Sequence, residues 1–151
     1  PESAARREFR GLQYFPYQAR WRLPARFIRY QPARELPLLD VTGAITPETS
    51  TGAVVFTWEG REHRLETVED KETHDLFVIF SDLTAGKTTY GAGRFLHAPH
   101  PDGDDRTVLD FNFAYNPPCA FTAYATCPRP PRENRLQIAI EAGEKRYAGG
   151  H

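Results

Sequence analysis

Polar side chains gather at the end of one predicted strand, in the stretch "LDFNFAYNPPCAF" (residues 109–121). Residues two apart on a strand project to the same face, so Asp110 and Asn112 should lie together, with Tyr115 and Asn116 just beyond. An aspartate beside an asparagine suits a general base with an amide donor, or a ligand clamp. In the structural alternative, Asp110 pairs with an arginine such as Arg94 and the asparagines cap turns.

Both cysteines of the chain, Cys119 and Cys127, follow this strand. Four states stay open for them: buried free thiols, a disulfide worth roughly 2 to 3 kcal/mol, metal ligands, or a thiol nucleophile. Zinc would need two more ligands, and His97 and His100 in "HAPH" do not have a standard zinc spacing. We therefore expect no metal site and no cofactor.

Five prolines belong to the same region: Pro117, Pro118, Pro128, Pro130 and Pro131. Proline fixes φ and restricts the unfolded chain, so a long irregular segment can be held in one shape. We expect an ordered proline-rich loop that walls a pocket or forms a structural corner. Phe121 and Tyr124 are predicted to anchor it to the core.

Upstream elements must position these residues. The start "PESAARREFRG" predicts a short N-terminal helix, and Pro24 makes residues 12–31 an edge strand or two extended pieces. Two β-rich runs, 52–58 and 61–68, meet at Glu59-Gly60 and predict a hairpin. The apolar run in "THDLFVIFSD" indicates a buried strand.

Three further strands are expected downstream. One resumes at Lys87 after a turn, with Gly91 and Gly93 marking a bulge or a close backbone approach. Another covers 107–115 and points Leu109, Phe111 and Phe113 at the core. The last is "RLQIAIEAG", with Leu136, Ile138 and Ile140 on one face. The fold class is therefore mainly β, an antiparallel β-sandwich or barrel with a short N-terminal helix and a long proline-rich loop.

Length and composition suit one globular domain over residues 1–151, divided into an N-terminal arm (1–38) and a β core (39–147). The chain is 40% hydrophobic and has 13 prolines, which indicates many turns. No run reaches the roughly 18 apolar residues of a membrane span, and we expect a cytoplasmic protein. Exposed edge strands permit a homodimer.

The net charge of −1 argues against nucleic acid or an anionic membrane as a partner. Residues 1–38 nevertheless carry eight arginines against three glutamates, about +5, which leaves about −6 for the remainder. Such a block is typical of a solvated basic face; a phosphate or nucleic-acid patch is the weaker alternative.

Two stretches match part of a nucleotide-binding motif, but each lacks a glycine that the motif requires. The stretch "TAGKTT" has Ser81 where a phosphate-binding loop needs a glycine, and "GAGRFL" has Leu96 where a dinucleotide fingerprint needs its third glycine. Neither stretch precedes a predicted helix whose N-terminus could hold phosphate.

Four blocks together resemble the bacterial and archaeal DUF1684 family, named for its unknown function: "FSDLTAGKTTYGAGRFL", "LDFNFAYNPPCAF", "ATCPRPPRENRL" and "EAGEKRY". The resemblance covers about residues 9–147. The polar and glycine positions that carry it are Asp82, Thr84, Gly86, Thr89, Tyr90, Gly93, Arg94, Asp110, Asn112, Tyr115, Asn116, Cys119, Cys127, Asn134, Arg135, Glu144 and Lys145.

The sequence leaves three functional hypotheses. In the first, a small, polar or anionic ligand binds a pocket lined by Tyr90, Arg94, Asp110, Asn112, Tyr115, Asn116 and Glu144. In the second, the protein is a hydrolase with Asp110 or Glu144 as general base and Arg94 or Tyr90 as electrostatic stabiliser. In the third, these residues form a buried network in a structural or protein-interaction module.

Overall fold

The computed structural model describes residues 12–147. Its strands are β1 (Arg22–Leu39), β2 (Ile45–Trp58), β3 (Arg61–Glu66), β4 (Val68–Glu69), β5 (Leu76–Phe80), β6 (Arg94–Ala98) and β7 (Arg106–Asp110). Four short 3-10 turns complete the elements: η1 (Ala19–Trp21), η2 (Phe111–Phe113), η3 (Pro118–Ala120) and η4 (Arg132–Asn134). The predicted N-terminal helix lies outside the described residues.

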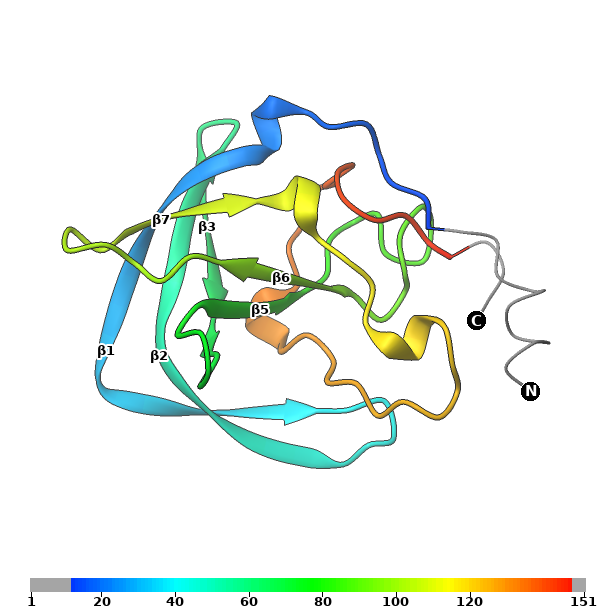
Figure 1. Ribbon diagram of the computed structural model, residues 1–151, viewed down its shortest axis with the longest axis horizontal. Coiled ribbons are helices and arrows are strands. Elements are labelled where there is room, and N and C mark those ends of the chain that lie inside the picture. The colour runs from blue at the N-terminus through cyan, green and yellow to red at the C-terminus, as the bar shows by residue number, and fades with distance from the viewer. Residues whose placement is uncertain (1–11, 148–151) are drawn as a thin grey trace.

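The strands form two antiparallel sheets, ordered β3-β2-β1-β7 and β4-β5-β6. Figure 1 shows β1 and β2 running side by side, bending together and continuing beneath the second sheet. The mainly β prediction is confirmed, but the sheets do not close into a barrel. Within the described residues, no helix is long and apolar enough to span a membrane.

One apolar core joins the two sheets. Phe27 and Phe56 from the first sheet belong to the same buried cluster as Val78 and Phe80 from the second. Burying a side chain of this size contributes roughly 1.5 to 3 kcal/mol. Because the cluster draws on both sheets, neither sheet can bury its apolar face alone.

The predicted hairpin at Glu59-Gly60 is confirmed. Strands β2 and β3 pair with Trp58 opposite Arg61, and the turn residues have φ values of 49° and 78°. Two successive positive φ values are typical of a tight type I′ turn, whose twist matches that of the flanking strands. The predicted buried strand is also confirmed as β5.

The edge assignment of the first strand is wrong, because β1 lies between β2 and β7. Pro24 is tolerated because it pairs only with β7, while pairing to β2 begins at Arg26. Pro24, which has no backbone N–H to donate, therefore lies where β1 pairs with only one strand. Residues 22–38 of the predicted arm are thus part of the larger sheet.

The strand predicted from Lys87 does not form; β6 begins only at Arg94. Residues 82–93 fold into tight turns, in which the Thr84 carbonyl accepts hydrogen bonds from the amides of Lys87, Thr88 and Thr89. The close approach predicted at Gly93 is confirmed. Its φ is 97°, and a Cβ atom there would lie 2.6 Å from the Phe80 carbonyl oxygen.

The strand predicted over 107–115 ends early, at Asp110. The Asp110 carboxylate accepts a hydrogen bond from the Asn112 amide and starts the η2 turn. That turn changes the side-chain directions, so Phe111 is buried as predicted while Phe113 is 71% exposed. The prediction that Phe113 faces the core is therefore wrong.

The final predicted strand, "RLQIAIEAG", does not form a regular strand, although its alternate apolar residues do face the core. Leu136 and Ile140 are buried, and Ile138 packs against the core. The Leu136 amide bonds the Ser81 carbonyl at 2.8 Å, and the Leu83 amide bonds the Ile138 carbonyl at 2.9 Å. These few parallel contacts hold the segment beside the end of β5 without building a ladder.

Candidate functional site

The seven residues predicted to share a pocket fall into separate groups. Arg94, Glu144 and Asn116 form one of these groups, because Arg94 Nη1 donates to the Glu144 carbonyl oxygen at 3.2 Å and the Glu144 carboxylate accepts from the Asn116 amide. Tyr90 contacts Cys119, whereas Tyr115 pairs with His97.

Arg94, the first residue of β6, is 1% exposed. Its Nη2 atom donates to the Ile140 carbonyl at 3.1 Å and lies 3.5 Å from Asp82 Oδ1, and its Nη1 atom donates to the Ala142 carbonyl. Asp82 Oδ2 also accepts from the Ile140 amide at 2.6 Å and from the Thr84 hydroxyl at 2.8 Å. This buried ion pair holds the C-terminal segment against the turns after β5.

Glu144 ties that segment to the start of the proline region. Its Oε1 atom accepts from the Asn116 amide at 2.9 Å, and Asn116 Nδ2 donates to the Lys145 carbonyl at 3.0 Å. Burial raises the pKa of Glu144. Within the described residues, Glu144 Oε2, Asn116 Oδ1 and Arg94 Nε are buried without a hydrogen-bond partner.

Asp110 and Asn112 do meet, but their hydrogen bonds are internal. Asn112 Nδ2 donates to Asp110 Oδ1 at 2.8 Å and to the Gln18 carbonyl at 2.9 Å, and Asn112 Oδ1 accepts from the Gln18 amide. The pair thus fastens the chain before η1 to the end of β7. The alternative in which Asp110 pairs with Arg94 is wrong, because Arg94 pairs with Asp82.

Cys119 and Cys127 are free, buried thiols. The Cys119 amide donates to Cys127 Sγ at 3.2 Å, and the Tyr90 hydroxyl lies 3.6 Å from Cys119 Sγ. Burial raises the pKa of Cys127 to about 11 and that of Tyr90 to about 12. Cys127 is therefore protonated at neutral pH, which disfavours it as a nucleophile because the reactive form is the thiolate.

The two histidines weighed as zinc ligands have other contacts. His97 Nε2 lies 2.6 Å from the Tyr115 hydroxyl, and the two rings are stacked. His100 Nδ1 lies 2.9 Å from the His74 carbonyl oxygen. Among the residues that the structure describes, no group of three or more His, Cys, Asp or Glu side chains could hold a metal ion.

A cavity of about 280 Å³, which we name the hairpin cavity, lies elsewhere, where the bent β1–β2 hairpin meets β4, β5 and the proline region. None of the seven predicted residues lines it. Its lining residues are Leu38, Asp40, Thr46, Glu48, Val68, Phe77, Ile79, Thr126 and Pro128. A neighbouring cavity of about 320 Å³ shares Glu48 and Val68 with it, so the hollow continues along β2.

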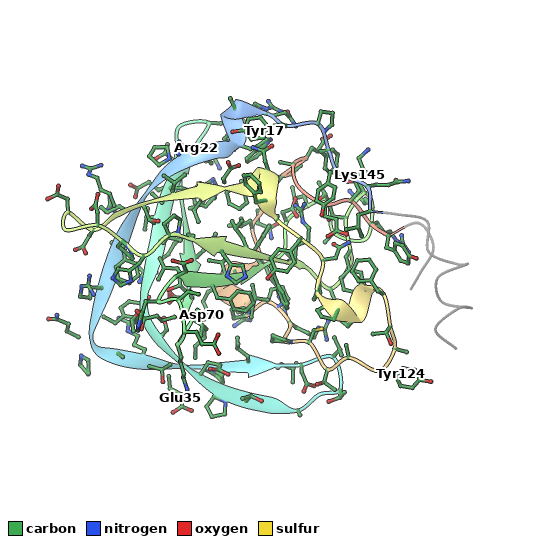
Figure 2. The ribbon with its side chains drawn as sticks, in the orientation of Figure 1. Tyr17, Arg22, Glu35, Asp70, Tyr124 and Lys145 are labelled. Atoms are coloured by element: carbon green, nitrogen blue, oxygen red, sulfur yellow. The ribbon has the colours of Figure 1, made fainter. Side chains whose placement is uncertain are left out.

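The proline segment (residues 117–131) closes one side of the hairpin cavity. The Arg129 amide donates to the Leu39 carbonyl at 2.7 Å, and the Val41 amide donates to the Cys127 carbonyl at 3.2 Å. Tyr124 does not anchor this segment as predicted: Figure 2 shows it at the outer edge of the molecule, where it is 94% exposed. Phe121 instead makes an edge contact with Tyr147.

The hairpin cavity combines an apolar surface with acidic groups. Leu38, Val68, Phe77 and Ile79 supply the apolar surface, and Ile79 and Leu38 are themselves buried. Asp40 Oδ1 accepts hydrogen bonds from the Thr42 side chain and from the amides of Thr42 and Ala44. These bonds, that from the Thr42 hydroxyl first, lower the pKa of Asp40, so it is a carboxylate at neutral pH.

Sequence reasoning missed the hairpin cavity because its lining comes from four separate segments. The available signal was Asp40 at the end of an alternating apolar stretch, Leu36 and Leu38, and two residues before Thr42 of a Thr-Gly turn. Acidic residues at strand ends are frequent turn formers, so this signal does not single out a site.

Comparison with known proteins identifies the family of this chain and a solved structure with a similar fold. The model of the family described as "Protein of unknown function (DUF1684)" matches residues 7–145. The solution NMR structure of the uncharacterized protein from gene locus rrnAC0354 of Haloarcula marismortui is similar, with a TM-score of 0.75 and 29% sequence identity. That match covers 93% of this chain and 78% of the other. No curated protein matches. Since the family model spans nearly the whole sequence, the chain belongs to the DUF1684 family.

Proposed function

We propose that this chain is a small-molecule-binding β domain whose ligand occupies the hairpin cavity. The observation that carries the proposal is the combination of four apolar side chains with two carboxylates, Asp40 and Glu48, around one cavity. The ligand is a short apolar group with a cationic head, such as a primary amine. This differs from the polar or anionic ligand that the sequence alone favoured.

Size supports a small ligand. Binding sites for small molecules commonly have volumes of roughly 300 to 1,000 Å³, and the hairpin cavity, at about 280 Å³, lies just below that range. Each buried methylene contributes about 0.8 kcal/mol, so a chain of five or six carbons supplies useful affinity.

Charge supports a cationic head. No lysine or arginine is among the residues that line the hairpin cavity. Asp40 is ionised at neutral pH, and only its Oδ1 atom accepts the hydrogen bonds of the turn. Glu48 has no hydrogen-bond or ion-pair partner within residues 12–147. Two carboxylates with free oxygen atoms favour an ammonium group over an anion.

In this proposal the motif residues act indirectly. Glu144 fixes Asn116, the residue directly before Pro117, and Arg94 fixes the C-terminal segment behind it. They thereby hold the proline segment in the position where Thr126 and Pro128 wall the cavity. The hydrolase alternative, with Asp110 or Glu144 as base, is less well supported, because both carboxylates and the Arg94 guanidinium are engaged in internal hydrogen bonds.

The test compares three probes of equal chain length: n-hexylamine, hexanol and hexanoate. Binding is followed by amide chemical shifts in NMR spectra of the protein, and native against denaturing mass spectra report any ligand that copurifies. We expect hexylamine to bind most tightly and to shift amides of residues 38–48 and 77–79. Glu48→Gln should weaken hexylamine roughly tenfold and leave hexanol unchanged.

Glu35→Gln is the matched control, since Glu35 is an exposed carboxylate on the same hairpin but does not line the cavity (Figure 2). It should leave hexylamine binding within twofold of the wild type. The proposal fails if hexanoate binds as tightly as hexylamine, or if the shifted amides lie away from the hairpin cavity.

A further inference from the structure

A second concave site lies at the bend of β1, lined by Ile28–Arg34 of β1 and by Arg64 of β3, with a volume of about 580 Å³. The register between β1 and β2 shifts there. Arg29 pairs with Gly52 and Arg34 with Ser50, so five steps along β1 correspond to two along β2. The additional residues of β1 form the bend visible in Figure 1 and leave the hollow beside it.

Tyr30 forms a fixed centre for this hollow. It is buried, and its hydroxyl lies 2.6 Å from the Glu66 carboxylate. Arg64 of β3 donates to the same hydroxyl from across β2. The guanidinium carbon of Arg34 lies 3.9 Å from the centre of the Tyr30 ring, and that of Arg64 lies 5.6 Å from it. Two guanidinium groups are thus held around one immobile ring.

The charges in the hollow are not fully compensated. Arg29 pairs with Asp105 at 3.0 Å, and Arg64 Nε lies 3.9 Å from Glu66. Arg34 has no carboxylate within 4 Å in the part of the chain that the structure describes. Three arginines against two carboxylates leave one cation in excess, and that cation is already positioned by the Tyr30 ring.

We propose that the bend of β1 is a binding site for the phosphoryl group of a small soluble molecule, held by Arg34 and Arg64. Guanidinium groups present planar pairs of N–H donors that match the oxygen atoms of a phosphoryl group. Stacking on Tyr30 restricts the Arg34 side chain before any ligand arrives, which reduces the entropy lost on binding.

This site is independent of the hairpin cavity. It uses opposite charge chemistry and shares no lining residue with that cavity. The basic N-terminal third of the sequence therefore has a local site on β1, where the sequence by itself favoured a solvated face.

The test titrates pyrophosphate, and citrate in parallel, into the wild-type protein and into Arg34→Gln, with binding followed by amide chemical shifts. We expect pyrophosphate to shift amides of residues 28–34 and 64. Arg34→Gln should weaken pyrophosphate binding roughly tenfold, because it removes charged hydrogen bonds to the anion. Hexylamine binding to the same variant should stay unchanged, which separates this site from the proposed function.

Arg61→Gln is the matched control, because Arg61 is an exposed arginine of β3 that does not line the hollow. If Arg61→Gln weakens pyrophosphate as much as Arg34→Gln does, the attraction is a general charge effect and the proposal is overturned. Citrate binding as tight as pyrophosphate binding would overturn the phosphoryl assignment. If pyrophosphate shifts no amide signals of residues 28–34, the proposal that it binds at the bend of β1 is overturned.

Discussion

The buried cluster around Arg94 and the hairpin cavity both contain charged side chains, yet these side chains use their polar atoms differently. In the cluster, Arg94 and Asp82 direct their hydrogen bonds to each other and to backbone groups of the C-terminal segment. In the cavity, Glu48 has no partner within the described residues, and Asp40 keeps one carboxylate oxygen free of turn bonds.

This difference indicates which region holds structure and which is suited to a ligand. A buried charge is costly unless it is paired, so removing one partner of such a pair is strongly destabilising. A partly exposed carboxylate remains hydrated and costs little to replace. Substitutions should therefore separate the two regions by their effect on the free energy of unfolding.

The largest effect is expected for Arg94→Met. This change leaves the Asp82 carboxylate buried without its cation and leaves the Ile140 and Ala142 carbonyls without a donor. We expect a loss of about 3 to 5 kcal/mol in the free energy of unfolding, measured by urea denaturation. Arg106→Met, at the exposed first residue of β7, serves as control and should change stability little. A loss below about 1 kcal/mol at Arg94 would contradict the structural role of the cluster.

A smaller effect is expected for Asp110→Ala. The Asp110 side chain caps the η2 turn and bonds Asn112, so its removal should cost about 1 kcal/mol, as for other caps. Thermal unfolding measures the change. Loss of hexylamine binding at unchanged stability would instead place Asp110 in a ligand site, as the sequence alone suggested.

The contribution of Glu144 to the free energy of unfolding should depend on pH. Burial raises its folded-state pKa above the value of 4.5 for a free side chain, so the folded protein binds this proton more tightly than the unfolded chain. The resulting stabilisation is full below about pH 4.5 and is lost as pH rises through the folded pKa. In urea titrations from pH 4 to 7, wild-type stability relative to Glu144→Gln should therefore fall with rising pH. A difference that grows with pH would show that hydrogen bonds to the carboxylate outweigh its burial.

The smallest effect on stability is expected at the rim of the hairpin cavity. Glu48→Gln removes a carboxylate with no internal partner in the described residues, so stability should stay within about 0.5 kcal/mol of the wild type. Differential scanning calorimetry provides the measurement. A destabilisation comparable to that of Arg94→Met would remove the distinction between the two regions.

Local patterns in the sequence predicted the mainly β class and several elements correctly. The Glu59-Gly60 turn, the apolar run of β5 and the close approach at Gly93 each depend on residues adjacent in sequence. The alternation of Leu136 and Ile140 also predicted their burial, although no strand forms there. Phe113 was mispredicted because the Asp110 side chain ends β7 and the 3-10 turn breaks the period of two.

The candidate sites were less predictable for a physical reason. The sequence by itself determined which residues are polar, which are apolar and where the chain must turn, because these properties are local. Only the tertiary structure decided that Arg94 pairs with Asp82 and not with Asp110, and that Leu38, Glu48, Phe77 and Pro128 surround one cavity. Such contacts depend on how two sheets and the proline segment pack, and packing brings together residues that no sequence spacing relates.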